Sequence, residues 1–541
     1  MTCMRYCPTF AADMTNTKNL NHYGTLEQLF KGSVSSFKEN TLAAFADGEG
    51  ALTYEELAQK CEQMDRLLRS WGVSVGDRVA ILSENMPNWI VAFFTATAYG
   101  RVVVPILPDC SANEVANILN HSQSKAVFVS AKQKEKLSQC SLQADILEID
   151  MENLDAAPMG TCPVFFEEPR PDIHPSDLAA IIYTSGTSGN AKGVMLSHMN
   201  LCHNIVSARG VETACASDVW LSVLPMGHTF EMSLGMLYPF AVGASIYYLR
   251  KSPTPAVLMK AMADVRPTIM MSVPLIIEKV YRNAVLKQIN ASGLLRFVRA
   301  VAPAFLYRKI GRMLIKKFGG RIRFFGIGGA KLDSEVEAFL NKAGFPYAIG
   351  YGMTECAPLI CAATVGHTRV GSTGGAVAGM QVRLNDVNEA TGEGEIVVKG
   401  PNVMMGYYKD EARTSQVFTA DGWLRTNDLA VMSENGYFDI KGRLGNMILG
   451  ASGENIYPEE IEMVIAGVPF VEESLVKSEN GKLIALVRLS DGRVAGDHEA
   501  RRILTSVNPM LNKASQLAEI RFVQEEFQKT ATRKIRRFLY A

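Results

Sequence analysis

Apolar and polar positions alternate along the first half of the chain with two different periods, which predicts alternating strands and helices. Thr53-Tyr54-Glu55-Glu56 is a helix-capping pattern, and the helix that it begins ends near Gly72. The pattern then predicts, in order, a strand at Arg78–Leu82, an apolar helix from Pro87, a strand at Val102–Ile106, a helix from Ser111 and a strand at Ala126–Val129. This order of strand, crossover helix and strand predicts a parallel sheet covered by helices on both faces.

The pattern changes in the last third of the chain. Similar α/β units continue from Ala179 to about Gly350, but short strands and turns follow from Val377. A helix begins at Pro458, and Asn480-Gly481 predicts a hairpin. The predicted fold class is therefore α/β, with a large N-terminal domain of parallel-sheet subdomains plus a β-rich subdomain, and a small mobile C-terminal α+β domain. We predict domains at residues 1–443 and 444–541, with a hinge at Arg443 to Gly445.

Two apolar stretches are long enough to raise the question of a membrane span. Trp89 to Leu107 is interrupted by Gly100 and Arg101, and Leu234 to Leu249 contains a proline and falls short of about 18 residues. We interpret both as buried helix and strand. The first residues have no continuous apolar core typical of a signal peptide. The expected location is the cytoplasm.

Composition narrows the class of protein. Hydrophobic residues make up 48% and charged residues 20% of the 541 positions, which excludes a disordered or coiled-coil chain. The 55 basic and 55 acidic side chains balance, so no nucleic-acid partner is expected. The ten cysteines form no C-x-x-C pair, which fits a reducing compartment.

The strongest local motif is a loop of small and hydroxylated residues that follows an apolar strand, Tyr183-Thr-Ser-Gly-Thr-Ser-Gly-Asn-Ala-Lys192-Gly193. Glycines let successive backbone N–H groups face one anion, hydroxyls add donors, and the lysine adds a positive charge. The motif predicts a phosphate-binding loop. It is not a Walker A motif, because glycine follows the lysine. A dinucleotide fingerprint is excluded as well, since Lys331 occupies the third glycine position after Gly326-Ile-Gly328-Gly329.

Five motifs in a fixed order resemble those of the adenylate-forming (ANL) superfamily, which includes acyl-CoA synthetases, peptide-synthetase adenylation domains and luciferases. The loop that ends at Lys192 is the first. The others are Tyr351-Gly-Met-Thr-Glu355, Gly422-Trp-Leu-Arg-Thr-Asn-Asp428, Gly442-Arg443 with Ser452-Gly453-Glu454-Asn-Ile-Tyr-Pro-Glu-Glu-Ile461, and Lys529-Thr-Ala-Thr-Arg-Lys534-Ile. A chance match of five motifs in this order is negligible.

The resemblance implies an ATP-dependent reaction in which a carboxylate is first joined to AMP, because a carboxylate anion is too poor an electrophile to react with a thiol. It implies two sets of nucleotide-binding residues. The set for the β- and γ-phosphates is Thr184, Ser185, Gly186, Thr187, Ser188, Gly189 and Lys192, and the set near the adenine is Gly328, Gly329, Ala330, Tyr351 and Gly352.

The resemblance also implies the remaining site residues. Asp428 and Arg443 bind the ribose hydroxyls, and Gly453 and Glu454 line the path of the CoA thiol after the C-terminal lobe rotates. The catalytic residues are Thr354, Glu355 and Lys534. Glu355 holds Mg²⁺, a hard cation that prefers oxygen ligands, and Lys534 bridges the carboxylate and the α-phosphate, where positive charge offsets repulsion between the two anions.

Four positions depart from the family pattern. Asn427 and Arg533 replace the usual glycines, Ala191 stands where proline is common, and Gly445 stands where a charged hinge residue is common. An uncharged glycine at the hinge is expected to loosen the rotation between the two half-reactions. None of the four departures removes a charged side chain with an implied role, so we expect activity.

The block from Leu221 to Glu231 resembles the bacterial long-chain fatty acid–CoA ligases more than other branches. The expected reaction is therefore ATP-dependent ligation of a fatty acid to CoA with release of AMP and pyrophosphate. His228 either meets the acid near its carboxyl end or is a core histidine with satisfied hydrogen bonds. Three alternatives stay open for the whole protein: transfer of the acyl group to an acyl carrier protein, a fatty-acid-binding homologue with impaired catalysis, and a phosphotransferase, which would release ADP in place of AMP.

A basic segment comes from this sequence and not from the resemblance. Between Lys279 and Arg323 there are twelve Lys or Arg residues and no Asp or Glu, interleaved with apolar side chains. Such a segment suits peripheral contact with an anionic membrane, here the inner face of the cell membrane. Two other interpretations are open, namely a landing site for the phosphates of CoA and helices with a solvated basic face.

Overall fold

The computed structural model describes residues 23–156, 172–185, 191–449, 455–490, 495–530 and 534–540. These residues divide into two compact units, each of which is described by itself. The first contains the chain up to Thr184 with Ala191–Gln381 and Val398–Phe418, and the second contains Val382–Val397 and the chain from Thr419 onward. The domain boundary after Arg443 stays a prediction.

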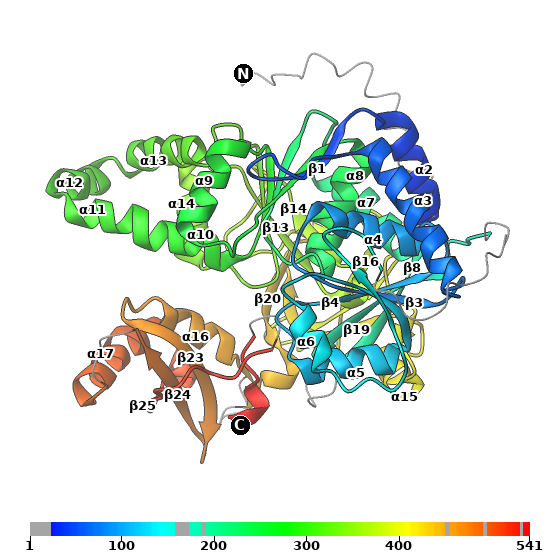
Figure 1. The fold of residues 1–541 in the computed structure, drawn as a ribbon. Coiled ribbons are helices and arrows are strands. Elements are labelled where there is room, and N and C mark those ends of the chain that lie inside the picture. The colour runs from blue at the N-terminus through cyan, green and yellow to red at the C-terminus, as the bar shows by residue number, and fades with distance from the viewer. Residues whose placement is uncertain are drawn as a thin grey trace. The chain divides into compact units, whose positions relative to one another are not determined.

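Two largely parallel sheets form the first unit, as the alternating pattern predicted (Figure 1). In the seven-stranded sheet, β3 pairs in parallel with β4 and β5, and antiparallel pairing is seen between β18 and β8 at one edge. Its strands, in spatial order, are β18 (Gly406–Tyr407), β8 (Ala191–Ser197), β7 (Leu178–Ser185), β4 (Val102–Ile106), β3 (Arg78–Leu82), β5 (Ser124–Val129) and β6 (Leu147–Asp150).

The nine-stranded sheet is parallel in its centre and antiparallel at both edges. Its spatial order is β15 (Gly375–Ala376), β14 (Leu359–Ala363), β13 (Tyr347–Gly352), β12 (Phe324–Ile327), β11 (Ile269–Ser272), β9 (Val219–Ser222), β10 (Ser245–Tyr248), β1 (Thr41–Phe45) and β2 (Leu52–Thr53). Parallel neighbours need crossover connections, and helices supply them.

The helices of the first unit lie mostly between these strands in sequence, while α2 precedes the first strand and α15 follows the last. They are α2 (Leu26–Phe37), α3 (Tyr54–Ser70), α4 (Pro87–Thr97), α5 (Ala112–Ser122), α6 (Lys134–Ser138), α7 (His198–Val211), α8 (Tyr238–Val242), α9 (Pro255–Val265), α10 (Pro274–Val280), α11 (Lys287–Ala291), α12 (Gly293–Val301), α13 (Pro303–Lys317), α14 (Ser334–Ala343) and α15 (Glu411–Val417). Shorter π or 3-10 segments are η2 (Glu231–Leu237), η3 (Tyr281–Leu286) and η4 (Thr354–Cys356).

The second unit has shorter strands and turns. Its elements are β16 (Gln381–Asn385), β17 (Glu393–Lys399), β19 (Leu424–Met432), β20 (Phe438–Arg443), η5 (Leu444–Asn446), β21 (Ile448–Leu449), β22 (Asn455–Ile456), α16 (Pro458–Ala466), β23 (Val471–Glu479), β24 (Lys482–Leu489), α17 (Asp497–Val507), η6 (Asn508–Met510), η7 (Lys513–Ser515), β25 (Glu519–Phe522) and η8 (Arg537–Leu539). Strands β16, β17, β19 and β20 form one sheet and β23, β24 and β25 another.

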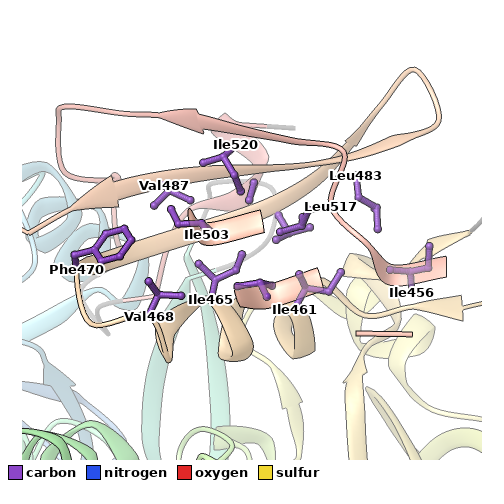
Figure 2. Packing of buried hydrophobic residues seen from close by; sticks show 13 residues of the cluster. Ile456, Ile461, Ile465, Val468, Phe470, Leu483, Val487, Ile503, Leu517 and Ile520 are labelled. Carbon is purple, nitrogen blue, oxygen red and sulfur yellow. The ribbon is translucent and has the colours of Figure 1, made fainter. Parts of the chain in front are cut away.

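A separate apolar core holds the C-terminal α+β part together. Ile461 and Ile465 on α16 and Ile503 on α17 pack with Val487 and Ile520 from the sheet, and all five are buried (Figure 2). The hairpin between β23 and β24 turns at Asn480-Gly481, where both residues have positive φ, as the predicted turn requires. The predicted small α+β lobe therefore has a hydrophobic core of its own.

The predicted helix starts are confirmed at the level of hydrogen bonds. The Thr53 backbone N–H donates to Glu56 Oε2 at 2.8 Å, and the Glu56 N–H donates to Thr53 Oγ1 at 3.2 Å. Ser111 and Glu114 repeat this arrangement at the start of α5. Each box satisfies backbone donors that the first helical turn leaves without partners.

Both apolar stretches fold as predicted, into buried helix and strand. Trp89–Leu107 forms α4 and β4, and Arg101 within it is also buried, with 2% of its surface exposed. Its guanidinium Nη1 lies 2.7 Å from Asp65 Oδ1, and its Nε donates to the Val73 carbonyl at 2.9 Å. Among the described residues, no helix is long and apolar enough to cross a membrane.

Replacing Asp65 with alanine is expected to lower the free energy of unfolding by about 3–5 kcal/mol, because it leaves the buried Arg101 charge without its partner. Urea denaturation followed by circular dichroism measures the change. The matched control is Asp264→Ala, which removes an exposed i,i+4 pair with Lys260 and should change stability by less than about 1 kcal/mol. Equal losses of stability in the two variants would contradict the conclusion that Asp65 neutralises the buried Arg101 charge.

Candidate active site

An ion pair between a half-buried lysine and a buried glutamate joins two of the sequence motifs. Lys192 Nζ lies 2.7 Å from Glu355 Oε1, although 163 positions separate the two residues in sequence. Lys192 also donates to the Tyr407 hydroxyl at 2.7 Å, and that hydroxyl donates to Glu355 Oε1 at 2.9 Å. The three side chains therefore form a closed triangle of hydrogen bonds.

Strand pairing places the lysine and the tyrosine on one face of the sheet. Tyr407 on β18 lies opposite Val194 on β8, and Lys192 is two residues before Val194. Side chains two residues apart on a strand point to the same face, so Tyr407 and Lys192 are diagonal neighbours. Glu355 reaches them from η4, the turn that follows β13.

The charge of Glu355 depends on these partners. Its side chain is only 6% exposed, and burial by itself raises the pKa of a carboxyl group. The Lys192 charge and the hydrogen bonds outweigh burial and hold the pKa of Glu355 below its ordinary value. Burial and the neighbouring carboxylate raise the pKa of Tyr407, so its hydroxyl stays a donor. Glu355 is thus an ionised carboxylate at neutral pH.

Backbone and amide hydrogen bonds fix the turn that carries Glu355. The Met404 N–H donates to the Glu355 carbonyl at 2.8 Å. The buried Asn204 amide donates to the Cys356 carbonyl at 3.1 Å and accepts from the Leu359 N–H at 2.9 Å. Thr354, a predicted catalytic residue, begins the same turn. Tyr407 and Asn204 were missed by sequence reasoning, because neither lies in a motif with a chemical pattern.

The predicted phosphate loop is described only in part. Thr184 lies near the end of β7, the strand next to that of Lys192, and Ser185 is the last residue of β7. The hydroxyl oxygen of Thr184 is buried and has no hydrogen-bond partner among the described residues. Gly186, Thr187, Ser188 and Gly189 lie outside the described residues.

The predicted adenine residues gather at the carboxyl ends of two neighbouring parallel strands. Gly328, Gly329 and Ala330 directly follow β12, while Tyr351 and Gly352 end β13. Gly329 has φ +84°, a left-handed conformation that glycine adopts without strain, and a Cβ at Gly352 would collide with the Pro358 carbonyl. Ligands of open α/β sheets bind outside the carboxyl ends of strands, so the placement suits a nucleotide.

The predicted ribose residues form a pair within the second unit. Asp428 on β19 lies opposite Arg443 on β20, with 3.1 Å between Asp428 Oδ1 and Arg443 Nε. Asn427, which replaces a family glycine, has φ +59°. Asparagine is one of the few residues that tolerate this conformation, so the departure preserves the backbone that glycine would give.

The other predicted residues are placed individually. Lys534 is exposed, and its backbone N–H donates to Thr530 Oγ1 at 3.2 Å. His228 is half-buried in the turn before η2, with its N–H donating to the Pro225 carbonyl at 3.0 Å. Gly453 and Glu454 lie outside the described residues, as does Arg533. Their roles stay predictions.

Comparison with known proteins decides the family. The model of the AMP-binding enzyme family matches residues 31–408. Long chain acyl-CoA synthetase 7, peroxisomal, of Arabidopsis thaliana is 31% identical over 86% of this chain and 73% of its own length. Feruloyl-CoA synthase of an Amycolatopsis species is also 31% identical, over 84% of this chain and 87% of its own length.

This chain belongs to the AMP-binding enzyme family. The crystal structure of ATP-bound MatB from Rhodopseudomonas palustris has the same fold, with a TM-score of 0.75 and 24% identity over 95% of this chain and 98% of that one. The predicted α/β fold class and the predicted membership of the adenylate-forming superfamily are confirmed.

The described residues of this AMP-binding enzyme fit the nucleotide that the family implies. The partnerless Thr184 hydroxyl and the Lys192 ammonium offer donors to phosphate oxygens. Among the described residues, no cluster of three or more His, Cys, Asp or Glu side chains is arranged to hold a metal. Mg²⁺ commonly binds through one or two carboxylates together with substrate phosphates, so a single carboxylate such as Glu355 is compatible with the metal role that the resemblance implies.

Replacing Tyr407 with phenylalanine in this AMP-binding enzyme should lower the free energy of unfolding by about 1.5–3 kcal/mol, the value of a hydrogen bond to a charged group. The measurement is urea denaturation. Tyr408→Phe is the matched control, because Tyr408 is the next residue on the chain and contacts the His121 ring instead. If both variants unfold at the same urea concentration, Tyr407 does not support the ion pair.

A second buried carboxyl lies one turn after His228, and no cation among the described residues pairs with it. Glu231 on η2 is 1% exposed, and its Oε2 has no hydrogen-bond partner among the described residues. Burial raises the pKa of Glu231 to about 8, although a hydrogen bond from Ser222 lowers it in part. Glu231 is therefore protonated in the folded protein at neutral pH.

Glu231→Gln should stabilise the protein increasingly as the pH rises. The unfolded chain releases the Glu231 proton near pH 4.3 and the folded chain near 8, so the wild type loses about 1.4 kcal/mol per pH unit in this window and glutamine does not. Thermal denaturation of both proteins at several pH values measures the difference. Glu135→Gln, at an exposed position on α6, is the control. A difference that does not change with pH would contradict the protonated state.

Proposed function

We propose that this AMP-binding enzyme is an ATP-dependent ligase that joins a long-chain fatty acid to CoA and releases AMP and pyrophosphate. The observation that carries the proposal is the ion pair between Lys192 and Glu355, which brings together a phosphate-loop motif and a second family motif. ATP chemistry needs a cation for the phosphates and a hard ligand for Mg²⁺, and this pair supplies both within one hydrogen-bond distance.

The first half-reaction requires the chain to bring two anions together. Lys192 and the Thr184 hydroxyl would bind the β- and γ-phosphates. Glu355 would hold Mg²⁺, which would neutralise phosphate charge when bound. Asp428 accepts hydrogen bonds from the ribose hydroxyls, and Lys534 of the second unit supplies positive charge to the carboxylate as it attacks the α-phosphate.

The identity of the acyl group and of the acceptor is proposed from the sequence and from the named relatives. The block from Leu221 to Glu231 resembles long-chain ligases, and a long chain acyl-CoA synthetase is among the relatives. Feruloyl-CoA synthase is an equally identical relative, and feruloyl is an aromatic acyl group. Both relatives are named for CoA, which favours CoA over an acyl carrier protein. The pair between Lys192 and Glu355 argues against a homologue with impaired catalysis.

The test is a competition among acids and acceptors. The protein is incubated with ATP, Mg²⁺, a graded series of fatty acids and ferulic acid, with CoA and holo-acyl carrier protein both present, and products are identified by mass spectrometry. We expect acyl-CoA and AMP, with the highest rate for a long-chain acid. Thioester on the carrier protein would select the alternative acceptor, and ADP in place of AMP would identify a phosphotransferase.

Variants separate the two half-reactions. Lys534→Ala should lower the rate of acyl-adenylate formation by about 100-fold or more, because it removes positive charge from the transition state. It should retain thioester formation from synthetic acyl-adenylate and CoA. Lys513→Ala, another exposed lysine of the second unit, is the control. Equal rates of adenylate formation in the two variants would remove Lys534 from the mechanism.

A further inference from the structure

The apolar face of α12 is exposed. Leu294, Phe297 and Val301 recur at helical spacing, which places them on one face, and they are 72%, 63% and 63% exposed. In α12, all of whose residues are described, none is buried. Single exposed apolar side chains are ordinary, but three large ones on one helix face mark an interaction surface.

The next helix combines one more exposed aromatic residue with basic side chains. Phe305 on α13 is 67% exposed, and Arg308, Lys309, Arg312 and Lys316 follow at spacings that keep them on the same side of the helix. The opposite side is buried through Leu306, Gly311 and Leu314, and a Cβ at Gly311 would collide with the Ala343 carbonyl of α14. The basic side therefore cannot turn inward.

The segment from Lys279 to Arg323 carries charge of one sign, although α14, which packs against α13, carries Glu335 and Glu337. Of the twelve basic residues between Lys279 and Arg323, only Arg282 and Arg323 form ion pairs with carboxylates of the described residues. The remaining ten include the exposed cations of α12 and α13. Figure 1 shows α11, α12 and α13 at the end of the helical part of the first unit, away from its strands.

We propose that the exposed face of α12 and α13 docks on an anionic lipid bilayer. Apolar side chains flanked by cations match a membrane surface, in which acyl chains lie beneath negatively charged headgroups. The two alternatives explain less. A solvated basic helix does not account for the exposed apolar side chains of Leu294, Phe297 and Phe305. The phosphates of CoA would bind only the cations. This docking goes beyond the proposed ligase activity and does not depend on it.

Vesicle flotation with the full-length protein tests the docking without any catalytic step. We expect the protein to float with vesicles of phosphatidylcholine and phosphatidylserine, to stay behind with phosphatidylcholine alone, and to dissociate at high salt. Two triple variants should each weaken binding by about 100-fold or more. They are Leu294→Ser, Phe297→Ser and Phe305→Ser together, and Arg308→Gln, Arg312→Gln and Lys316→Gln together.

Control variants replace three exposed apolar residues or three exposed lysines elsewhere, and they should bind like the wild type. They are Val75→Ser, Val387→Ser and Met510→Ser together, and Lys38→Gln, Lys132→Gln and Lys513→Gln together. Wild-type protein that stays soluble with anionic vesicles overturns the proposal. A molar mass in light scattering that falls in the serine variant would identify a second copy as the occupant. A raised KM for CoA with unchanged flotation of the glutamine variant would identify a CoA site.

Discussion

The Lys192–Glu355 ion pair is the interaction on which the candidate site depends. A carboxylate with so little exposure stays ionised only if a cation and hydrogen-bond donors replace the water that it has lost. Lys192 and Tyr407 do this, and each comes from a different strand of one sheet. Because the ion pair requires these contacts, β8, β18 and the turn after β13 must bring Lys192, Tyr407 and Glu355 within hydrogen-bond distance of one another. The same pair holds a carboxylate and an ammonium group side by side, and these are the two groups that the proposed ATP chemistry requires.

Two other buried ionisable side chains show the effect of an oppositely charged partner that is present or missing. Arg101 is as deeply buried as Glu355, and Asp65 neutralises it inside the first unit. Glu231 has no cation beside it, and it adapts by keeping its proton. One physical rule, the cost of moving a charge out of water, therefore gives two outcomes, an ion pair at Glu355 and Arg101 and a protonated side chain at Glu231. The neighbours decide among them, and burial alone does not.

At exposed positions, backbone conformation and uncovered apolar area matter more than the cost of burying a charge. Asn427 in β19 replaces a family glycine but keeps the positive φ, so the backbone conformation before Asp428 does not require glycine. On α12 and α13 the tertiary structure leaves apolar and basic side chains in solvent together, although folding normally separates them. Covering an exposed apolar helix face is favourable, because apolar surface is removed from water. That gain, combined with uniform positive charge, is what links these helices to an anionic bilayer.

The sequence by itself determined the alternation of strands and helices, the capping of α3 and α5, the hairpin at Asn480-Gly481 and the order of the five motifs. These depend on spacing and on contacts between residues close in sequence, which local patterns encode. Only the tertiary structure brought Lys192 to Glu355, added Tyr407 and Asn204, buried Glu231 without a cation and left the α12 face uncovered. Each of these results from contacts between residues far apart in sequence, and burial and partners are properties of those contacts. No periodicity or spacing along the chain specifies them.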